Sequence, residues 1–223
     1  MIKYFAPYAI IFLFSACSNT PELETGEIKT LKWFSEAIDQ SQNSNSFIDA
    51  KTLLTRSQID SADIPVLYVE LESGQNGTLT PYPGQGIGQT WLGADGATIT
   101  LEKGVLKASR GMGNDVMGAT STMPLWKKLN SGVETYTRTV KYLNGNNKIF
   151  TKNFKCKIHE VTEGEIIKIW SLEFDVSRYQ EICNNNGFVT KNTYYVDDRE
   201  IVRRSKQYHS DTIGYIITER LDR

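Results

Sequence analysis

Closely spaced turn signals after Pro65 constrain most strongly what this chain of 223 residues can fold into. They stand at Asn76-Gly77, Pro83-Gly84, Lys103-Gly104 and Asn144-Gly145, between segments rich in β-branched and aromatic residues. Strands joined by such short turns pair in antiparallel fashion. The sequence therefore predicts a mainly β fold, an antiparallel meander that forms a curled sheet, a sandwich or a half-barrel. The predicted strands are residues 66–71, 98–101, 105–109, 133–143, 148–159, 166–174, 187–196, 201–208 and 214–220.

One or two α-helices are predicted to precede the strands and to pack on the sheet. An apolar stripe with a period of about 3.6 residues predicts an amphipathic helix over 27–40. This stripe consists of Ile28, Leu31, Phe34 and Ile38. A second, short helix is predicted over 47–55, whereas residues 115–129 have no clean period and are expected to form a loop. We expect a single β-rich domain over 27–223.

The first residues of the chain have the layout of a bacterial export signal. Lys3 is followed by about thirteen mostly apolar residues, and Ser15 and Ala16 then lead into Cys17. This order resembles the lipobox of bacterial lipoproteins, so we expect residues 1–16 to be removed and Cys17 to be lipidated. The apolar stretch is too short for a transmembrane helix, which needs about twenty residues. Cleavage at another bond, which would leave Cys17 as an ordinary thiol, is the remaining alternative.

Residues 17–26 are polar and are expected to act as a lipidated tether. Ser18 follows the cysteine in place of aspartate, which by resemblance to the sorting rules of Gram-negative lipoproteins favours the outer membrane, with the domain facing the periplasm. Each buried methylene of an acyl chain contributes about 0.8 kcal/mol to membrane binding. Several chains on Cys17 would therefore make the attachment effectively permanent.

Charge and cysteine usage narrow the partners and the compartment. The chain has 25 basic and 26 acidic residues and no long run of either sign, so nucleic acid is not an expected partner. Once Cys17 is acylated, Cys156 and Cys183 remain as an even pair, which suits a disulfide in the periplasm. No metal or other cofactor is expected, because His159 and His209 are the only histidines and no Cys-x-x-Cys spacing exists.

The two histidines do not indicate a catalytic site. His159 follows Cys156 by three residues, and on an alternating strand this offset places the two side chains on opposite faces. His209 lies near a turn and is expected to be a surface residue or part of local structure. No nucleophile and base pair is predicted from either position.

Two further motifs resemble functional sites but are better explained as loop or turn structure. Gly84, Gly86 and Gly88 are spaced like a phosphate-binding loop, but no helix follows to supply an N-terminal dipole. Asp197, Asp198 and Glu200 could form a calcium loop or a glycosidase pair, yet their order also fits a hairpin turn, which we favour. The sequence therefore predicts no catalytic residue.

Aromatic side chains could form a surface for stacking on sugar rings if they were exposed together. The candidates are Trp91, Trp126, Trp170, Tyr194 and Tyr195. Aromatic residues in strands pack more often in a core than on a surface. Trp91, Trp126 and Tyr195 are retained as a possible ligand surface.

Scattered residues from Trp91 to the C-terminus resemble a known family. The first group is Trp91, Asp95, Thr98, Leu101, Gly104, Leu106, Gly111 and Asp115, and the second is Glu181, Cys183, Asn192, Tyr194-Tyr195-Val196-Asp197, Ile201, Arg204-Ser205 and Gln207-Tyr208. Together with the signal and Cys17, they are similar to the YjbF/GfcB family of capsule and exopolysaccharide lipoproteins. Tyrosine stands at Tyr195 and Tyr208, where tryptophan is commoner in the family. The resemblance carries over no catalytic residue.

The resemblance implies a periplasm-facing outer-membrane lipoprotein that works with other envelope proteins in the assembly or export of a surface polysaccharide. We therefore expect a non-enzymatic accessory factor whose partners are the outer membrane and either export proteins or the polysaccharide itself. A lipid or lipoprotein carrier with an apolar cavity under a curled sheet is the alternative. A polysaccharide-modifying enzyme would need paired carboxylates or a nucleophile and base in one cleft, and the sequence shows no such set.

Overall fold

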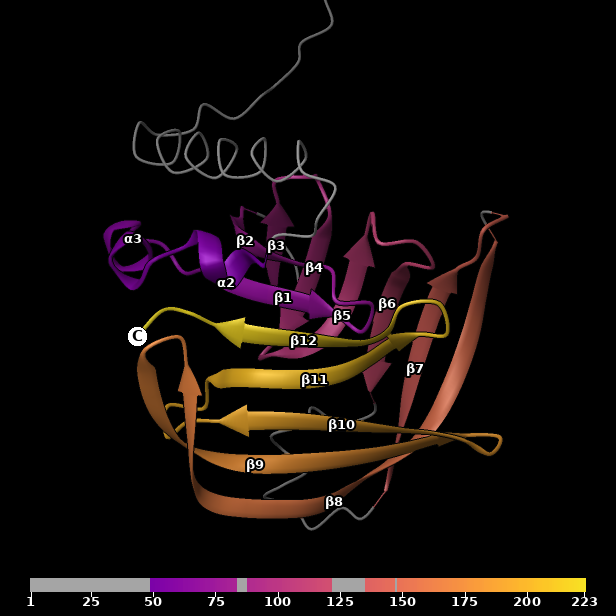
Figure 1. Cartoon of the computed structure of the whole chain (residues 1–223). Coiled ribbons are helices and arrows are strands. Elements are labelled where there is room, and N and C mark those ends of the chain that lie inside the picture. The colour runs from indigo at the N-terminus through magenta and orange to yellow at the C-terminus, as the bar shows by residue number, and fades with distance from the viewer. Residues whose placement is uncertain (1–48, 84–87, 122–134, 147) are drawn as a thin grey trace, which may run out of the picture.

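The computed structural model describes residues 49–83, 88–121, 135–146 and 148–223. These residues form one antiparallel sheet in the strand order β5-β4-β3-β2-β1-β12-β11-β10-β9-β8-β7-β6 (Figure 1). The strands are β1 (Leu67–Leu71), β2 (Asn76–Tyr82), β3 (Gln89–Gly93), β4 (Thr98–Glu102), β5 (Val105–Arg110), β6 (Val116–Ser121), β7 (Tyr136–Leu143), β8 (Ile149–Ile169), β9 (Leu172–Asn185), β10 (Phe188–Val196), β11 (Val202–Ser210) and β12 (Gly214–Arg220).

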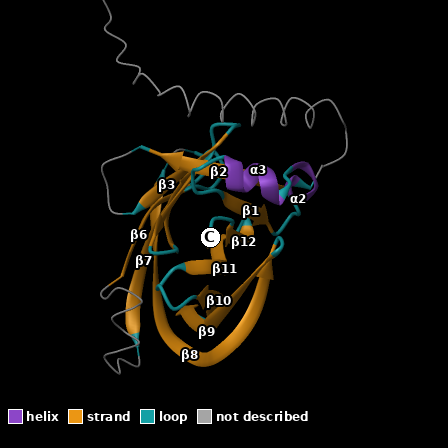
Figure 2. Cartoon of the chain, turned by 90° about the vertical axis from the view of Figure 1, so that its left-hand side faces the viewer, coloured by secondary structure: helices purple, strands orange, loops and turns teal. Residues whose placement is uncertain are grey.

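The sheet curls until it is nearly closed into a barrel, as the view along it shows (Figure 2). All strands that follow one another in the chain are neighbours in the sheet except β5 and β6. The first strand pairs with the last, from Leu67 opposite Arg220 to Leu71 opposite Ile216, which leaves β5 and β6 as the two edges. The predicted antiparallel, curled β fold is confirmed.

Turns gather at two ends of the sheet because its strands alternate in direction. We call the end with the β1–β2, β5–β6 and β11–β12 turns the β1–β2 end. The opposite end, with the β4–β5 and β10–β11 turns, is the β10–β11 end. These two ends differ in what they leave open, which bears on the candidate sites below.

One face of each strand points into the curl, since side chains alternate across a strand. On β7, for example, residues 136, 138, 140 and 142 are buried and those between them are not. The apolar part of this interior includes Leu67, Val69, Trp91, Ile99, Leu106, Val140, Phe154 and Ile216. A cavity of about 20 Å³ remains between them, which is room for one water molecule at most. The interior at this point is filled by side chains.

Two short helices lie on the outer face of β1 and β12. The first, α2 (Ala50–Leu53), is capped by the Asp49 carboxylate, and the second, α3 (Arg56–Ser61), begins with a Thr55/Gln58 capping box. They pack against the outward side chain of Tyr68 and against the end of the long β8–β9 hairpin. There the Trp170 indole N–H donates to the Leu54 carbonyl at 3.0 Å. Helix α2 falls within the helix predicted over 47–55, and α3 was not predicted.

The helix predicted over 27–40 lies outside the described residues. Neither α2 nor α3 has the length and apolar character that a membrane crossing would require, and no other described segment is a helix of that kind.

Some of the predicted strand boundaries are wrong. The strands β2 and β3 were not predicted, and β6 occupies residues 116–121, where a loop was expected. The strand predicted over 166–174 spans the β8–β9 turn instead. That turn is formed by Trp170, which has a φ of 53°, and by Ser171, so no glycine or asparagine marks it in the sequence.

Candidate functional site

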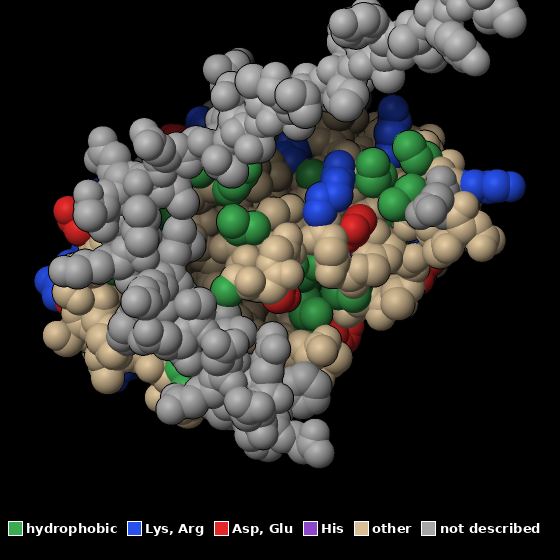
Figure 3. Space-filling model, turned by 90° about the horizontal axis from the view of Figure 1, so that it is seen from above, with side chains coloured by type: hydrophobic (Ala, Val, Ile, Leu, Met, Phe, Trp, Pro, Cys, Tyr) green, Lys and Arg blue, Asp and Glu red, His purple; other side chains and the backbone are tan. Residues whose placement is uncertain are grey.

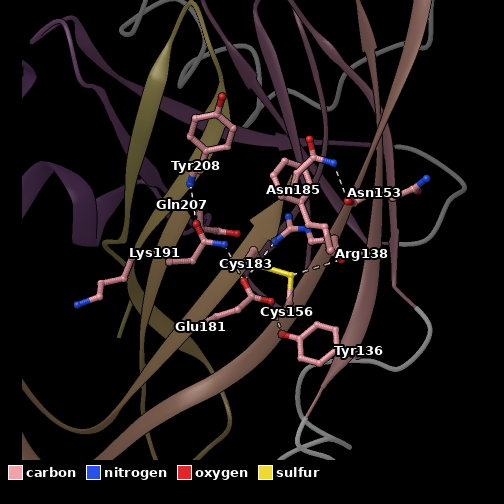
Figure 4. Close-up of a disulfide and its surroundings, with 12 residues drawn as sticks. Tyr136, Arg138, Asn153, Cys156, Glu181, Cys183, Asn185, Lys191, Gln207 and Tyr208 are labelled. Carbon is pink, nitrogen blue, oxygen red and sulfur yellow. Dashed lines mark hydrogen bonds and ion pairs between the residues drawn. A yellow bond between two sulfur atoms is a disulfide. The ribbon is translucent and has the colours of Figure 1, made fainter. Parts of the chain in front are cut away.

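A network of buried polar side chains lies inside the curl and is centred on Glu181 of β9. The Glu181 carboxylate accepts hydrogen bonds from the Tyr136 hydroxyl, from Asn192 Nδ2 at 2.6 Å and from the Tyr194 hydroxyl at 3.1 Å. Arg138 Nη1 lies 3.4 Å from the same carboxylate and forms an ion pair with it. Figure 4 shows Tyr136, Arg138 and Glu181 converging beside the disulfide. A buried charge is thus both paired and hydrogen-bonded, as burial requires.

The two tyrosines of this network act as neutral donors. Burial in the first place, and the charge of Glu181 in the second, raise the pKa of Tyr136 well above its ordinary value. The same two causes, in the same order, raise the pKa of Tyr194. Neither phenol can serve as a base near neutral pH, so the network holds protons in fixed places.

The network provides hydrogen-bond partners for backbone groups of the edge strand β5 and of the turn before it. This role explains why polar side chains lie in the interior of the sheet. Gln207 Oε1 accepts from the Leu106 N–H at 2.9 Å, and Arg138 Nη2 donates to the Leu106 carbonyl at 3.0 Å. Gln207 Nε2 also donates to the Gly104 carbonyl at 2.8 Å. A buried edge strand would otherwise leave these backbone groups without partners, each at a cost of about 1–3 kcal/mol.

Side chains also join the two edges of the sheet where β5 meets β6. Ser109 Oγ accepts from the Val116 N–H at 2.9 Å, and Arg110 Nη1 donates to the Val116 carbonyl at 2.9 Å. The Asp115 carboxylate accepts from the backbone N–H groups of Gly111 and Met112 and so shapes the β5–β6 turn. These contacts close the curl where no backbone ladder is formed between the described parts of β5 and β6.

His209 belongs to this seam, so of its two predicted placements, on the surface or in local structure, the surface placement is wrong. Its side chain is completely buried, and His209 Nε2 lies 2.8 Å from Ser109 Oγ. Asp115 contacts the serine hydroxyl, at 3.3 Å, and not the imidazole, so the three side chains are not ordered as a catalytic triad. Burial lowers the pKa of His209 to about 4, which keeps the ring neutral. His159, by contrast, is exposed on β8.

Cys156 and Cys183 form a disulfide between directly opposed residues of β8 and β9. Their sequence separation of 27 corresponds to about 3.5 kcal/mol of loop-closure entropy in the unfolded chain. Glu181 lies within 4.8 Å of both sulfur atoms, but the sulfurs are bonded to each other and the carboxylate already has four donors. This group therefore fits a structural cross-link and not a metal site.

The structure does not bring the predicted aromatic ligand surface together. Trp91 is 2% exposed and packs inside the curl, with the Arg220 guanidinium 5.0 Å from its ring centroid. Tyr195 lies on the outer face, in the cluster that includes Trp170. Trp126 lies outside the described residues. Trp91 and Tyr195 are thus on opposite sides of the sheet, and Trp91 offers no ring to a sugar.

The acidic motif forms a turn, as favoured from the sequence. Asp197 Oδ1 accepts from the backbone N–H groups of Arg199 and Ile201, while Asp197 Oδ2 pairs with the buried Arg203 at 2.7 Å. Its carboxylate is therefore occupied by the β10–β11 turn. Of the predicted glycine motif, only Gly88 is described, and a Cβ there would lie 2.6 Å from the Leu101 carbonyl oxygen, which explains the glycine by close packing.

Two open surfaces lie at the β1–β2 end, and sequence analysis identified neither. One is a largely apolar pocket of about 440 Å³ between β1–β4 and the β5–β6 turn. Figure 3 shows hydrophobic side chains on a hollowed face of the molecule seen from above. The pocket has no motif in the sequence, because its walls come from four separate turns.

The second open surface, which we call the aromatic rim, consists of Phe150, Phe188, Tyr208 and Tyr215 around a charged pair. Phe188 is 45% exposed and Phe150 37% exposed. Lys152 Nζ lies 5.5 Å from the Phe188 ring centroid and 2.7 Å from Asp211, and its hydrogen bond lowers the pKa of that carboxyl. Exposed rings beside polar groups are suited to binding amphipathic ligands.

The described part of the chain defines its class as a nearly closed antiparallel sheet whose buried polar groups serve the closure of the sheet. A pocket and an aromatic rim are open at the β1–β2 end, and a polar groove lies beside the β10–β11 turn.

The chain belongs to the YjbF family, described as "Group 4 capsule polysaccharide lipoprotein gfcB, YjbF", which matches residues 28–221. Its fold is similar to the crystal structure of the hypothetical lipoprotein YmcC from Escherichia coli K12, with a TM-score of 0.69. Sequence identity to that protein is 15%, over 92% of this chain and 98% of the other. Curated protein sequences contain no significant match.

The family resemblance now has a physical basis. Residues that carry the resemblance lie far apart in the sequence and meet in the polar network. They are Gly104, Leu106, Glu181, Asn192, Tyr194, Ser205 and Gln207. Gly111 and Asp115 shape the turn at the seam. Sequence analysis missed Arg138 and Ser109, which complete these two clusters, because an isolated arginine or serine in a strand carries no motif.

Proposed function

We propose that this protein is a lipidated, non-enzymatic accessory factor in the assembly or export of a capsule or exopolysaccharide. Cys17 carries the anchor, residues 17–26 form the tether, and the β domain faces the periplasm from the outer membrane. The observation that carries the proposal is the family match, which extends over residues 28–221 and so includes nearly the whole domain.

The described polar residues support a role in binding and not in chemistry. Glu181, Arg138, Gln207 and His209 are buried, and their polar atoms are engaged with each other or with strand backbone. A catalytic group must meet its substrate in a cleft, whereas these groups meet the fold. Among the described residues, open surface is offered by the pocket and the aromatic rim at the β1–β2 end, and by a polar groove beside the β10–β11 turn.

The anchor supplies the mechanism of such a factor. A domain held at a membrane by acyl chains meets other envelope components at an effective concentration that a diffusing protein lacks. Weak contacts of the aromatic rim with the polymer or with an export protein then suffice.

Deletion of the gene, followed by complementation, tests this proposal. Surface polysaccharide should fall in the deletion strain and return with the wild-type gene. It should not return with Cys17→Ala, although that protein should be present at the wild-type level in immunoblots. Unchanged polysaccharide after deletion would exclude the proposed role.

The pocket favours a second candidate, a lipid or lipoprotein carrier. Its volume of about 440 Å³ and its aliphatic walls would accommodate part of an acyl chain. Mass spectrometry of the protein purified from its host tests this candidate. A stoichiometric lipid that is not attached to Cys17 would support it, and protein without such a lipid would count against it.

A further inference from the structure

The pocket at the β1–β2 end exposes apolar side chains from four parts of the sheet. Its aliphatic and thioether walls are formed by Val69, Leu71, Leu79, Ile99, Met112 and Ile213. Its rim is polar and includes Gln75, Asn76 and Asp95. A concave apolar surface that is bordered by polar residues can accommodate another apolar group.

The chain enters the described part of the structure at this rim. The backbone N–H of Ala50 donates to Asn76 Oδ1 at 2.7 Å, and Asn76 lines the pocket. From there α2 leads along the sheet to Leu54, which is bonded to Trp170. The residues that precede Asp49 are therefore joined to the domain beside the pocket.

The preceding segment has an apolar face of matching character. Ile28, Leu31, Phe34 and Ile38 fall on one side of the helix predicted over 27–40. An amphipathic helix is stable only when such a stripe is buried. Eleven residues lie between Ile38 and Ala50, and an extended chain over these twelve Cα–Cα steps spans up to about 40 Å. The segment can thus reach any part of the pocket.

The family match also begins at residue 28. The apolar stripe therefore belongs to the part of the chain that the family shares, and not to the tether before it.

We propose that the apolar stripe of residues 28–38 docks in this pocket. The occupant is this chain's own segment, which lies close to the pocket by covalent connection and so binds at a high effective concentration. An added consequence rests on the proposed lipidation of Cys17. The short tether would then hold the β1–β2 end towards the membrane and the β10–β11 end, with the C-terminus, away from it.

Cross-linking in the mature chain tests the position of the segment. The protein carries Cys17→Ser, which removes the lipid and the competing thiol, and the paired substitutions Phe34→Cys and Met112→Cys. A short bis-maleimide should join this pair within one molecule at least about tenfold more efficiently than the control pair Phe34→Cys and Asp198→Cys, which places the second thiol at the β10–β11 end. Equal yields from the two pairs would overturn the proposal.

Binding of the apolar dye N-phenyl-1-naphthylamine gives a second readout in the same unlipidated protein. Phe34→Asp should release the stripe from the pocket and increase the affinity for the dye by about tenfold. The reason is that the large apolar side chain of residue 34 then no longer competes with the dye for the pocket. Lys29→Asp introduces the same side chain on the opposite side of the predicted helix and should leave the affinity unchanged. If the parent protein binds the dye as tightly as Phe34→Asp does, the pocket is open and the inference is wrong. Neither experiment depends on the lipid or on polysaccharide, so failure here would leave the proposed function standing.

Discussion

At the scale of single residues, Glu181 has the largest structural role in the interior. It pairs with Arg138, and Arg138 in turn donates a hydrogen bond to the carbonyl of Leu106 on the edge strand. Removing one member of a buried ion pair costs more than the pair contributes, because the remaining charge stays buried without a partner. The network is therefore sensitive to a change that hardly alters side-chain volume.

Glu181→Gln tests this sensitivity. We expect the free energy of unfolding to fall by about 3–5 kcal/mol, measured by urea denaturation with the disulfide intact. Glu102→Gln is the matched control, because Glu102 pairs with Lys107 at 2.6 Å on the surface, where a salt bridge contributes about 0–1 kcal/mol. Similar losses in both variants would contradict the role given to the network.

His209 predicts a pH dependence of stability. Its pKa is about 4 in the folded protein and about 6.5 in the unfolded chain, so between these values the unfolded chain binds a proton that the folded protein excludes. Stability should accordingly fall as the pH decreases from 6.5 to 4, by up to about 3 kcal/mol. Urea denaturation at pH 7 and pH 4.5 measures the loss.

The variant His209→Gln separates this residue from the carboxylates that also titrate in acid. It should be less stable than the wild type at pH 7, yet it should lose much less stability on moving to pH 4.5. If the wild type and the variant lose the same amount, His209 is not the origin of the pH dependence.

At the scale of elements, the β4–β5 turn packs closely against β11 across the curl of the sheet, and only a residue without a side chain fits at this contact. Gly104 has a φ of 79°, and a Cβ on it would lie 2.3 Å from Cγ2 of Val202. Gly96, in the β3–β4 turn, has a similar φ of 83° but open space around the same position. The two glycines share a backbone requirement and differ in packing.

Gly104→Ala should therefore be more costly than Gly96→Ala. Both substitutions strain a left-handed residue by about 1 kcal/mol, and overpacking should add about 1–3 kcal/mol in Gly104→Ala alone. Thermal and urea denaturation of the two variants provide the comparison. Equal destabilisation would mean that the turn does not press against β11.

Much of the sheet could be predicted from local sequence signals. Strands β4, β5, β10, β11 and β12 were found near their observed bounds, because glycine, asparagine or aspartate marks the turns beside them. The strands that were missed lack clear signals. Asn76-Gly77 begins β2 where a turn was expected, and Gly118 lies at a register shift in β6. The turn at Trp170 depends on tertiary packing against Leu54.

The candidate sites were less predictable than the strands. The cysteine pairing followed from the count of cysteines, but the partners of Glu181 on β9 come from β7 and β10, and only the curl of the sheet brings them together. The same curl buries Trp91 and leaves Phe150 and Phe188 open. Which aromatic rings are exposed depends on sheet closure, and local sequence does not contain that information.

At the scale of the whole molecule, the proposed function places a contact surface at one end of the curled sheet. The aromatic rim lies at the β1–β2 end, and its exposed rings are the proposed contact surface for polymer or for an export protein. A Phe150→Ala/Phe188→Ala double variant should weaken retention on the immobilised host polysaccharide by about tenfold while unfolding reversibly.

Ile166→Ala is the control for this prediction, because Ile166 is 61% exposed and lies outside the rim. Its retention should match that of the wild type. If the wild-type protein itself is not retained, or the double variant is retained equally, the rim does not bind the polymer, and an export protein becomes the partner to test by the same pair of variants.

The central claim is that acyl chains on Cys17 hold this domain at the outer membrane. Mass spectrometry of the N-terminal tryptic peptide, purified from the outer-membrane fraction of the native host, tests it most directly. The account predicts a peptide that begins at Cys17, ends at Lys29 and carries several acyl chains. A peptide with a bare Cys17 thiol, or one that begins at Tyr4 and so retains the leader, would show that Cys17 is not the lipidated N-terminus.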